Sequence, residues 1–281
     1  MKRKKHIVFA ALLIVFAIIT AVSIYDTNSF GCIQYDIQDE KLPEGFSGYR
    51  IALVSDLHNT QHGKGNSKLI SELKNAVPDI IVITGDLVDS SHTDITVALS
   101  FAENAVKIAP TYYVTGNHEA WLLPEEYLSL KEGLTEKGVR VLENESLDIE
   151  HDGDFITLIG VNDPDFGSDY GEYGLAAALE ELTQDSEHYT VLLSHRPEFF
   201  ELYRDYGINL VLSGHTHAGQ IRLPFIGAVM APGQGIFPKY DKGIFNEGDT
   251  TMVVSAGLGN SVIPFRLFNR AELNIITLSA P

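Results

Sequence analysis

Two histidines separated by one residue follow a short apolar run in the last third of the chain. The run covers residues 210–213 and leads into Gly214, His215, Thr216 and His217. A run of this kind is typical of a buried strand, and alternate residues of an extended segment share one face. Both imidazoles therefore come from the end of a predicted core strand, where they can bind a metal ion.

Four other apolar runs also end in residues that can bind metal ions. These are Asp56 and His58 after 51–55, Asp86 after 80–84, Asn117 after 112–115, and His195 after 191–194. Each pattern taken alone is common in an ordinary turn. Open α/β sheets place their sites at the carboxyl ends of their strands, so five coincident strand ends favour one shared site over five unrelated turns.

The donor set of these blocks consists of two carboxylates, four imidazoles and one amide oxygen. Seven such groups exceed the needs of one ion that keeps a position open, but they suit two ions that share a bridging carboxylate. The set has no thiolate, which argues against a structural zinc site. We expect two divalent metal ions as cofactors, with Mn2+ favoured and Fe, Zn2+ and Mg2+ also compatible with nitrogen and oxygen ligands.

In their order along the chain, the blocks resemble the signature of the calcineurin-like metallophosphoesterase superfamily. They read Asp56-x-His58, Gly85-Asp86, Gly116-Asn117-His118-Glu119, His195 and Gly214-His215-x-His217. The resemblance spans residues 49–220, and the segments 219–224 and 232–235 are similar to a membrane-associated bacterial branch. That branch is related to UDP-2,3-diacylglucosamine pyrophosphatases and cell-wall-associated phosphoesterases. The resemblance implies a four-layer α/β/β/α sandwich.

The resemblance also implies two ligand sets that share one bridging carboxylate. One ion would be held by Asp56, His58, Asp86 and His217, and the other by Asp86, Asn117, His195 and His215. His118 matches the family's further histidine, which lies near the scissile phosphate and protonates the leaving group or stabilises its charge. Glu119 follows it as a group that could orient the imidazole, although many diesterase members have Asp there.

The function implied by this resemblance is hydrolysis of a phosphoester or pyrophosphate bond by a hydroxide activated between two metal ions. Two divalent ions outweigh two aspartates and the hydroxide, so the site is expected to be locally positive inside an acidic protein. The residues after Asp86 narrow the substrate class. Protein Ser/Thr phosphatases of the superfamily have a block ending in Asp-Arg-Gly there, whereas this chain reads Leu87-Val88-Asp89. The missing arginine disfavours a protein phosphatase.

Three further residues are candidates for supporting the site or contacting the substrate: Asp163, Arg222 and Arg266. Each has an ordinary alternative, since Asp163 suits a turn and the two arginines suit solvated positions. The histidines that fit no block are predicted to lie at the surface. They are His62, His92, His151 and His188.

The first 25 residues predict a membrane helix. Residues 2–5 are all basic and 7–25 carry no charge, a run of about the length that a bilayer core requires. The run is longer than the apolar part of a typical signal peptide and no clear cleavage site follows, so a retained signal anchor is favoured over cleavage and secretion. The basic cluster predicts a cytoplasmic N-terminus. We therefore expect a single-pass protein of the cell membrane with an extracytoplasmic catalytic domain.

The rest of the chain predicts one α/β domain. Residues 26–48 read as a linker and a leading strand, and 49–281 as the metallophosphoesterase domain. Apolar, β-branched runs alternate with segments of helical spacing, as in α/β proteins. Strands are predicted at 49–55, 79–84, 111–115, 155–161, 189–194, 210–213, 250–255 and 271–278, and helices at 67–77, 94–108, 124–137, 174–182 and 197–206. Ser67 and Asp94 are expected as N-caps.

The resemblance and the predicted anchor imply a phosphoester small molecule or lipid as substrate, with the cell wall as a further candidate partner, whereas the charge of the chain argues against nucleic acid. Beyond the basic cluster, 16 Lys and Arg stand against 38 Asp and Glu, and such a surface repels the phosphates that supply most nucleic-acid affinity. No nucleic acid is expected. A nuclease of the same superfamily is the enzymatic alternative, and a non-catalytic, metal-retaining cell-wall-binding protein is the alternative of another class. Cys32 is the only cysteine, so no internal disulfide is expected.

Overall fold

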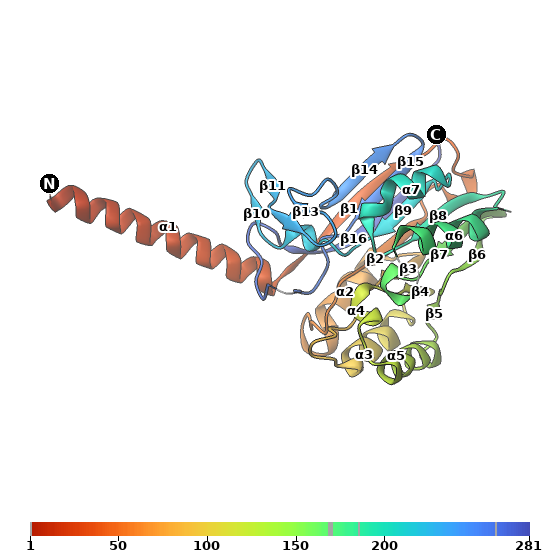
Figure 1. Cartoon of the computed structure of the whole chain (residues 1–281), viewed down its shortest axis with the longest axis horizontal. Coiled ribbons are helices and arrows are strands. Elements are labelled where there is room, and N and C mark those ends of the chain that lie inside the picture. The colour runs from red at the N-terminus through yellow and green to blue at the C-terminus, as the bar shows by residue number, and fades with distance from the viewer. Residues whose placement is uncertain (1, 168–170, 185, 262) are drawn as a thin grey trace.

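The computed structural model describes residues 2–167, 171–184, 186–261 and 263–281. Two six-stranded sheets pack face to face at the centre of the domain (Figure 1). The first sheet has the order β1-β16-β2-β3-β4-β5, with β1 (Phe30–Gln38), β2 (Arg50–Val54), β3 (Ile80–Thr84), β4 (Thr111–Val114), β5 (Arg140–Val141) and β16 (Ala271–Ser279). The second has the order β14-β15-β9-β8-β7-β6, with β6 (Glu145–His151), β7 (Asp154–Gly160), β8 (Tyr189–Leu193), β9 (Leu210–Ser213), β14 (Gly243–Glu247) and β15 (Thr250–Val254).

The central strands of each sheet run parallel. In the first sheet β2, β3 and β4 pair in this way, with Ile51 opposite Ile80. In the second sheet β7, β8, β9 and β15 do the same, with Val191 opposite Leu210. Parallel neighbours bring their carboxyl ends to one edge of a sheet, which is where open α/β folds carry their sites.

The alternation of side chains along each strand divides the core into layers. In β2, Ile51 and Leu53 belong to the apolar cluster between the sheets, whereas Ala52 and Val54 pack on the outer face. Strand β9 alternates in the same way between the inner cluster and the opposite outer face. Both faces of these strands are buried, which explains why their sequences are apolar throughout.

Helices cover the two outer faces. On the first sheet lie α2 (Ser67–Ala76), α3 (Ile95–Ala105) and α5 (Pro124–Glu136), and on the second lie α6 (Glu172–Thr183) and α7 (Phe200–Asp205). The predicted four-layer α/β/β/α sandwich is therefore confirmed.

The predicted strands agree with the structure to within one residue at each end. Asp94 is the N-cap of α3, since its carboxylate accepts the Thr96 N–H at 3.1 Å. The expected cap at Ser67 is wrong, because Ser67 is already the first residue of α2 and Asn66 precedes it without a capping hydrogen bond. The helix predicted at 197–206 is shorter, since Pro197–Phe199 forms a 3-10 turn before α7.

A leading strand is expected within 26–48 and β1 lies there, but its bounds and several short elements were not predicted. Within the segment 26–48, β1 pairs along its whole length with β16 at the edge of the first sheet. It is partly exposed, so its sequence lacks the apolar pattern of a core strand. Two small hairpins follow the last histidines: β10 (Arg222–Leu223) with β11 (Gly227–Ala228), and β12 (Met230–Ala231) with β13 (Gly235–Ile236).

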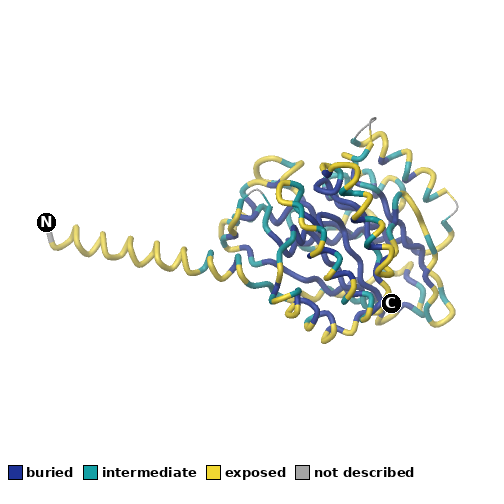
Figure 2. Tube along the Cα trace, turned by 90° about the horizontal axis from the view of Figure 1, so that it is seen from below, coloured by how far each residue is buried: buried dark blue, intermediate teal, exposed yellow. Residues whose placement is uncertain are grey.

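The N-terminal helix α1 (Lys2–Asn28) projects from the domain (Figure 1). It is exposed along nearly all of its length (Figure 2), and it is the one described helix that is long and apolar enough to cross a membrane. An α-helix of 27 residues is about 40 Å long, which exceeds the thickness of a bilayer core.

The packing between the sheets predicts the effect of a small substitution at Gly160. A Cβ there would overlap the Leu142 side chain and come within 2.8 Å of Val114 Cγ1. We expect Gly160→Ala to lower the free energy of unfolding by about 1–3 kcal/mol through overpacking. Thermal unfolding of the full chain in detergent measures this. Gly31→Ala, whose Cβ would meet nothing closer than 3.5 Å, is the matched control, and equal melting temperatures for both variants would contradict the described packing.

Candidate metal centre

The five ligand-bearing loops meet at the edge where the carboxyl ends of both sheets come together. Asp56 and His58 follow β2, Asp86 follows β3, Asn117 begins the short helix α4 (Asn117–Ala120) after β4, His195 follows β8, and His215 and His217 follow β9. All seven side chains are buried. The structure thus brings together every residue that the sequence predicts as a metal ligand.

One oxygen of Asp86 lies between two groups of imidazoles. Asp86 Oδ2 is 3.4 Å from His58 Nε2 and 3.2 Å from His195 Nε2. His217 Nε2 in turn lies 3.1 Å from His58 Nε2, and His215 Nδ1 lies 3.1 Å from His195 Nε2. A carboxylate oxygen in this position can ligate two ions at once.

The donor atoms form two groups, and within each group they lie within 4.8 Å of one another. The groups are Asp56, His58, Asp86 and His217, and Asp86, His195 and His215. Asn117 Oδ1 lies 3.1 Å from His195 Nε2 and extends the second group. This grouping coincides with the two ligand sets that the resemblance implies.

The chemistry of this set fits divalent metal ions. Two imidazole nitrogens that face each other at 3.1 Å can share only one proton, whereas a cation accepts both lone pairs. His195 Nδ1 lies 2.7 Å from the Thr84 carbonyl oxygen and donates its proton there, so Nε2 is left for an ion.

Most of the predicted ligands have a left-handed backbone. The angle φ is 51° at Asp56, 44° at His58, 51° at Asp86, 70° at His215 and 48° at His217. This conformation costs roughly 1–3 kcal/mol for a residue with a side chain. Backbone hydrogen bonds between adjacent loops hold it, since the His58 N–H donates to the Asp86 carbonyl and the Asp56 N–H to the Gly85 carbonyl. Strain is therefore concentrated at the cluster and offset by the fold around it.

Glycines let the loops approach one another. A Cβ on Gly214 would overlap Ser55 Oγ and the Asp56 carboxylate, and a Cβ on Gly116 would overlap Asp86 Oδ1. The Gly-His and Gly-Asn pairs of the sequence blocks thus have a steric cause, because any side chain there would displace a predicted ligand.

Burial and mutual charge set the protonation of the cluster. Burial lowers the pKa of His58 to about 4, and it holds the pKa values of His215 and His217 well below the ordinary range. Burial also disfavours the charged forms of Asp86 and His195, but the attraction between these two groups outweighs it. This attraction holds the pKa of Asp86 well below its usual range and raises the pKa of His195 to about 10. Without metal, a proton on His195 balances Asp86 at neutral pH.

His118 lies beside the cluster with a defined tautomer. The Ser90 backbone N–H donates to His118 Nδ1 at 3.1 Å, and the ring packs edge-on against His58. Since an amide N–H can only donate, the neutral ring carries its proton on Nε2. His118 is 7 % exposed, more than any of the seven ligands. Its Nε2–H is thus available as a donor, and Ser90 is a positioning residue that sequence reasoning missed.

The expected contact between Glu119 and the His118 ring is not what the structure shows. The Glu119 carboxylate accepts the backbone N–H groups of Asp86, Leu87 and Gly116, each at 2.8 Å. Burial and the nearby Asp86 raise its pKa to about 7, while these N–H groups favour the ionised form. Glu119 therefore joins the loops after β3 and β4 instead of orienting His118.

Comparison with known proteins agrees with this geometry. Residues 49–219 match the model of the calcineurin-like phosphoesterase family. The chain belongs to this family. The Bacillus subtilis metallophosphoesterase YkuE is 30% identical over 256 residues, which cover 88% of this chain and 85% of that protein.

Other relatives place the same domain in a longer chain. A zebrafish (Danio rerio) protein described as a transmembrane protein with a metallophosphoesterase domain is 33% identical, over 88% of this chain and 56% of its own length. The crystal structure of TT1561 of Thermus thermophilus has the same fold, with a TM-score of 0.51 and 16% identity over 75% of this chain and 90% of that one. Family membership and the buried cluster together make this metallophosphoesterase a metal-dependent hydrolase of phosphoester bonds.

Arg196 is a second residue of the site that the sequence did not reveal. Its guanidinium forms a bidentate pair with Asp163 at 2.6 and 2.9 Å, and Nη1 lies 3.3 Å from His215 Nε2. Glu198 Oε1 lies 3.9 Å from the same nitrogen. Asp163 thus supports the cluster through Arg196. The only signal in the sequence is that Arg196 directly follows His195.

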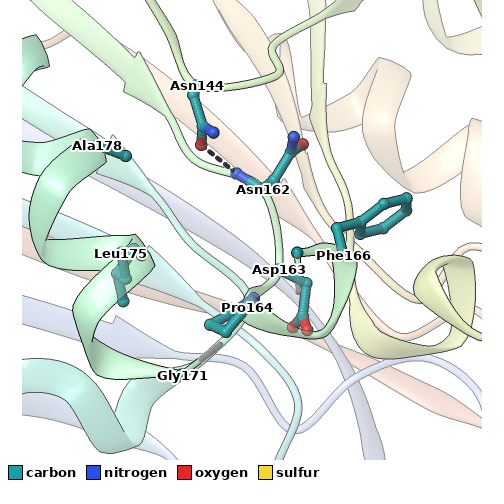
Figure 3. A pocket seen from close by; sticks show the side chains of 10 residues that line it. Asn144, Asn162, Asp163, Pro164, Phe166, Gly171, Leu175 and Ala178 are labelled. Carbon is teal, nitrogen blue, oxygen red and sulfur yellow. Dashed lines mark hydrogen bonds between the residues drawn. The ribbon is translucent and has the colours of Figure 1, made fainter. Parts of the chain in front are cut away.

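A cavity of about 350 Å3 lies beside this ion pair, between the end of β7 and α6 (Figure 3). Asp163, Phe166 and Leu175 line it, and the Asn162 N–H donates to Asn144 Oδ1 at 2.9 Å in its wall. The Asp163–Arg196 pair connects this wall to His215.

Both candidate arginines are bound by groups of the protein itself and are not solvated side chains. Arg222 pairs with Asp241 at 2.7 Å in the hairpin region. Arg266 is fully buried, and its Nη2 donates to the carbonyls of Ala256 and Gly259 and lies 3.5 Å from His217 Nδ1. Burial lowers the pKa of Arg266 to about 10, so it stays charged at neutral pH, and its charge together with burial keeps His217 neutral.

The surface position expected for the remaining histidines is wrong for His62. It is buried, and its Nε2 lies 2.9 Å from the Leu258 carbonyl oxygen. His92 and His188 are exposed, and His151 is partly exposed.

The proton on His195 predicts that metal binding is coupled to pH. At pH 7 this proton must leave before Nε2 can bind an ion, because the pKa of His195 without metal is about 10. We expect Mn2+ binding to release about one proton per chain and to strengthen as the pH rises. Titration calorimetry of the full chain in buffers of different ionisation enthalpy measures the release. A binding enthalpy that is identical in all buffers would contradict it.

Proposed function

We propose that this protein hydrolyses a phosphoester or pyrophosphate bond at a centre of two metal ions. The position of Asp86 Oδ2 between His58 Nε2 and His195 Nε2 carries the proposal, since it is where a bridging ligand is needed. Asp56, His58, Asp86 and His217 would hold the first ion, and Asp86, Asn117, His195 and His215 the second. Bound ions would lower the pKa of coordinated water and neutralise phosphate oxygens. We propose Mn2+ for both positions.

The protein supplies the general acid. We propose that His118 Nε2–H donates its proton to the leaving-group oxygen as the ester bond breaks. Ser90 keeps the proton on that nitrogen because its own N–H occupies Nδ1. With His215 Nδ1 on an ion, its Nε2 carries the proton, and the Glu198 carboxylate is the acceptor group on that side of the ring, held there by Arg196 at 3.6 Å.

The anchor narrows the choice of substrate. We propose that α1 spans the cell membrane with its basic N-terminus in the cytoplasm and the catalytic domain outside. Its apolar length and the transmembrane relative support the anchor. A tethered site meets phosphate compounds that are themselves linked to lipid or wall, as the resemblance to the membrane-associated branch also suggests. Comparison of monoester, diester and pyrophosphate substrates with the full chain tests the reaction class.

The proton-donor role predicts how His118→Asn behaves. We expect turnover to fall about 10²- to 10⁴-fold for an ester with an alkyl leaving group, because that oxygen must be protonated as it departs. The loss should be smaller for a nitrophenyl ester, whose leaving group is stable as an anion. Steady-state rates and metal content of the full chain are measured together. His188→Asn, which changes an exposed histidine, is the control. Unchanged turnover in His118→Asn, or equal losses on both esters, would contradict the role.

A further inference from the structure

Large apolar side chains are exposed at the end of the domain from which α1 emerges. They lie on the two small hairpins and on the loop before β16, in the region beside the base of α1 (Figure 1). The most prominent are Phe225, Ile226, Met230, Ile236, Phe237 and Phe268. We call these six residues the hairpin surface. Exposed apolar side chains that gather in one region, unlike single ones scattered over a surface, mark a binding surface.

The backbone presents three of these side chains in an unfavourable conformation. Phe225, Phe237 and Phe268 have φ of 68°, 54° and 51°. Left-handed turns ordinarily hold Gly or Asn, and a bulky aromatic residue there is rare. The three rings are exposed to solvent, so contacts within the domain do not offset this backbone strain. Packing of the domain therefore does not explain why phenylalanine occupies these positions.

Hydrogen bonds fix the hairpin surface at the level where α1 ends. Ser23 Oγ donates to the Arg266 carbonyl at 2.9 Å, and the Arg266 N–H donates to Thr27 Oγ1 at 2.9 Å. The same loop joins the first hairpin, because the Arg222 N–H donates to the Leu267 carbonyl at 3.0 Å. Ser23 belongs to the uncharged run 7–25, so this loop meets the helix at the boundary of the apolar span.

The polar groups near this boundary suit a lipid surface. Arg270 lies over the ring of Tyr25 at 5.0 Å, and both residue types are favoured at the membrane interface. The segment 221–270 contains five basic residues against three acidic ones, although the whole chain has a net charge of -18. This segment therefore lacks the excess of acidic residues that characterises the rest of the domain and that would repel anionic head groups.

We propose that the hairpin surface inserts into the leaflet next to the end of α1 and holds the metal centre over the head groups. The occupant is lipid and not a second protein, because the surface continues the apolar span of α1 at the same level. The centre is directly connected to it, since His217–Gly219 leads into β10 and Arg266 Nη2 lies 3.5 Å from His217 Nδ1. If the proposed function holds, a metal centre at this position acts on a phosphate compound carried in the bilayer, so this part of the inference rests on the proposed function.

Fluorescence quenching by lipid tests the insertion in the full chain. In a Cys32→Ser background, Phe225→Cys and Ile236→Cys each carry an environment-sensitive probe, and Leu128→Cys on α5 is the control. Ile236 and Leu128 are 68% and 52% exposed, so both sites can be labelled. The chain is reconstituted through α1 into phosphatidylcholine vesicles with or without spin-labelled phosphatidylcholine. We expect the hairpin probes to lose most of their fluorescence to the spin label and the Leu128 probe to lose little.

Two results would overturn the proposal. One is equal quenching of hairpin and control probes, which would place the hairpins in water. The other is a blue-shifted hairpin probe that lipid does not quench, which would indicate contact with protein. Quenching needs neither metal nor turnover, so an inactive protein with quenched hairpin probes would refute the proposed function alone.

A second arm tests the bilayer-borne substrate. The double variant Phe225→Ser, Ile236→Ser changes two exposed side chains outside the metal centre. We expect it to hydrolyse a vesicle-borne phosphoester several-fold more slowly than the unaltered chain, with an unchanged rate on a soluble nitrophenyl ester. Equal rates of both proteins on the vesicle-borne ester would refute the claim that the hairpin surface brings the metal centre to a substrate in the bilayer.

Discussion

The carboxylate of Asp86 is the interaction on which the site depends. One oxygen faces two imidazole groups that come from different sheets, and the other accepts the backbone N–H of His118 at 2.9 Å. Its neighbour in sequence, Gly85, adopts a left-handed turn, and Glu119 binds the Asp86 N–H from the next loop. These contacts fix the carboxylate before any ion binds, which is the preorganisation that a shared ligand requires.

The sandwich explains how such distant residues come to one point. Parallel strands deliver their loops to one edge, and packing two sheets face to face brings two such edges together. The loops then approach so closely that Gly116 and Gly214 have no room for a side chain. Left-handed turns at the ligands are strained, and the layers of apolar side chains behind them stabilise the fold enough to hold that strain.

The sequence predicts the core and the cluster well for a physical reason. Buried parallel strands are apolar on both faces, so their ends are easy to locate, and Asp56 or His217 stands shortly after such an end. Contacts that form only in the tertiary structure could not be predicted from the positions of apolar runs. Ser90 acts through its backbone N–H, which any residue type except proline offers, and Arg196 acts through a partner 33 residues away. The edge strand β1 and the hairpins lack the apolar periodicity that marks core strands.

Counting metal ions tests the division of the cluster most directly. The full chain is loaded with Mn2+, freed of unbound ions and assayed by mass spectrometry of the metal. Two ions per chain are expected for the unaltered protein and one for His215→Ala, since the group of Asp56, His58, Asp86 and His217 stays complete in that variant. One ion in the unaltered protein, or loss of both ions or of neither in the variant, would contradict a centre of two metals bridged by Asp86.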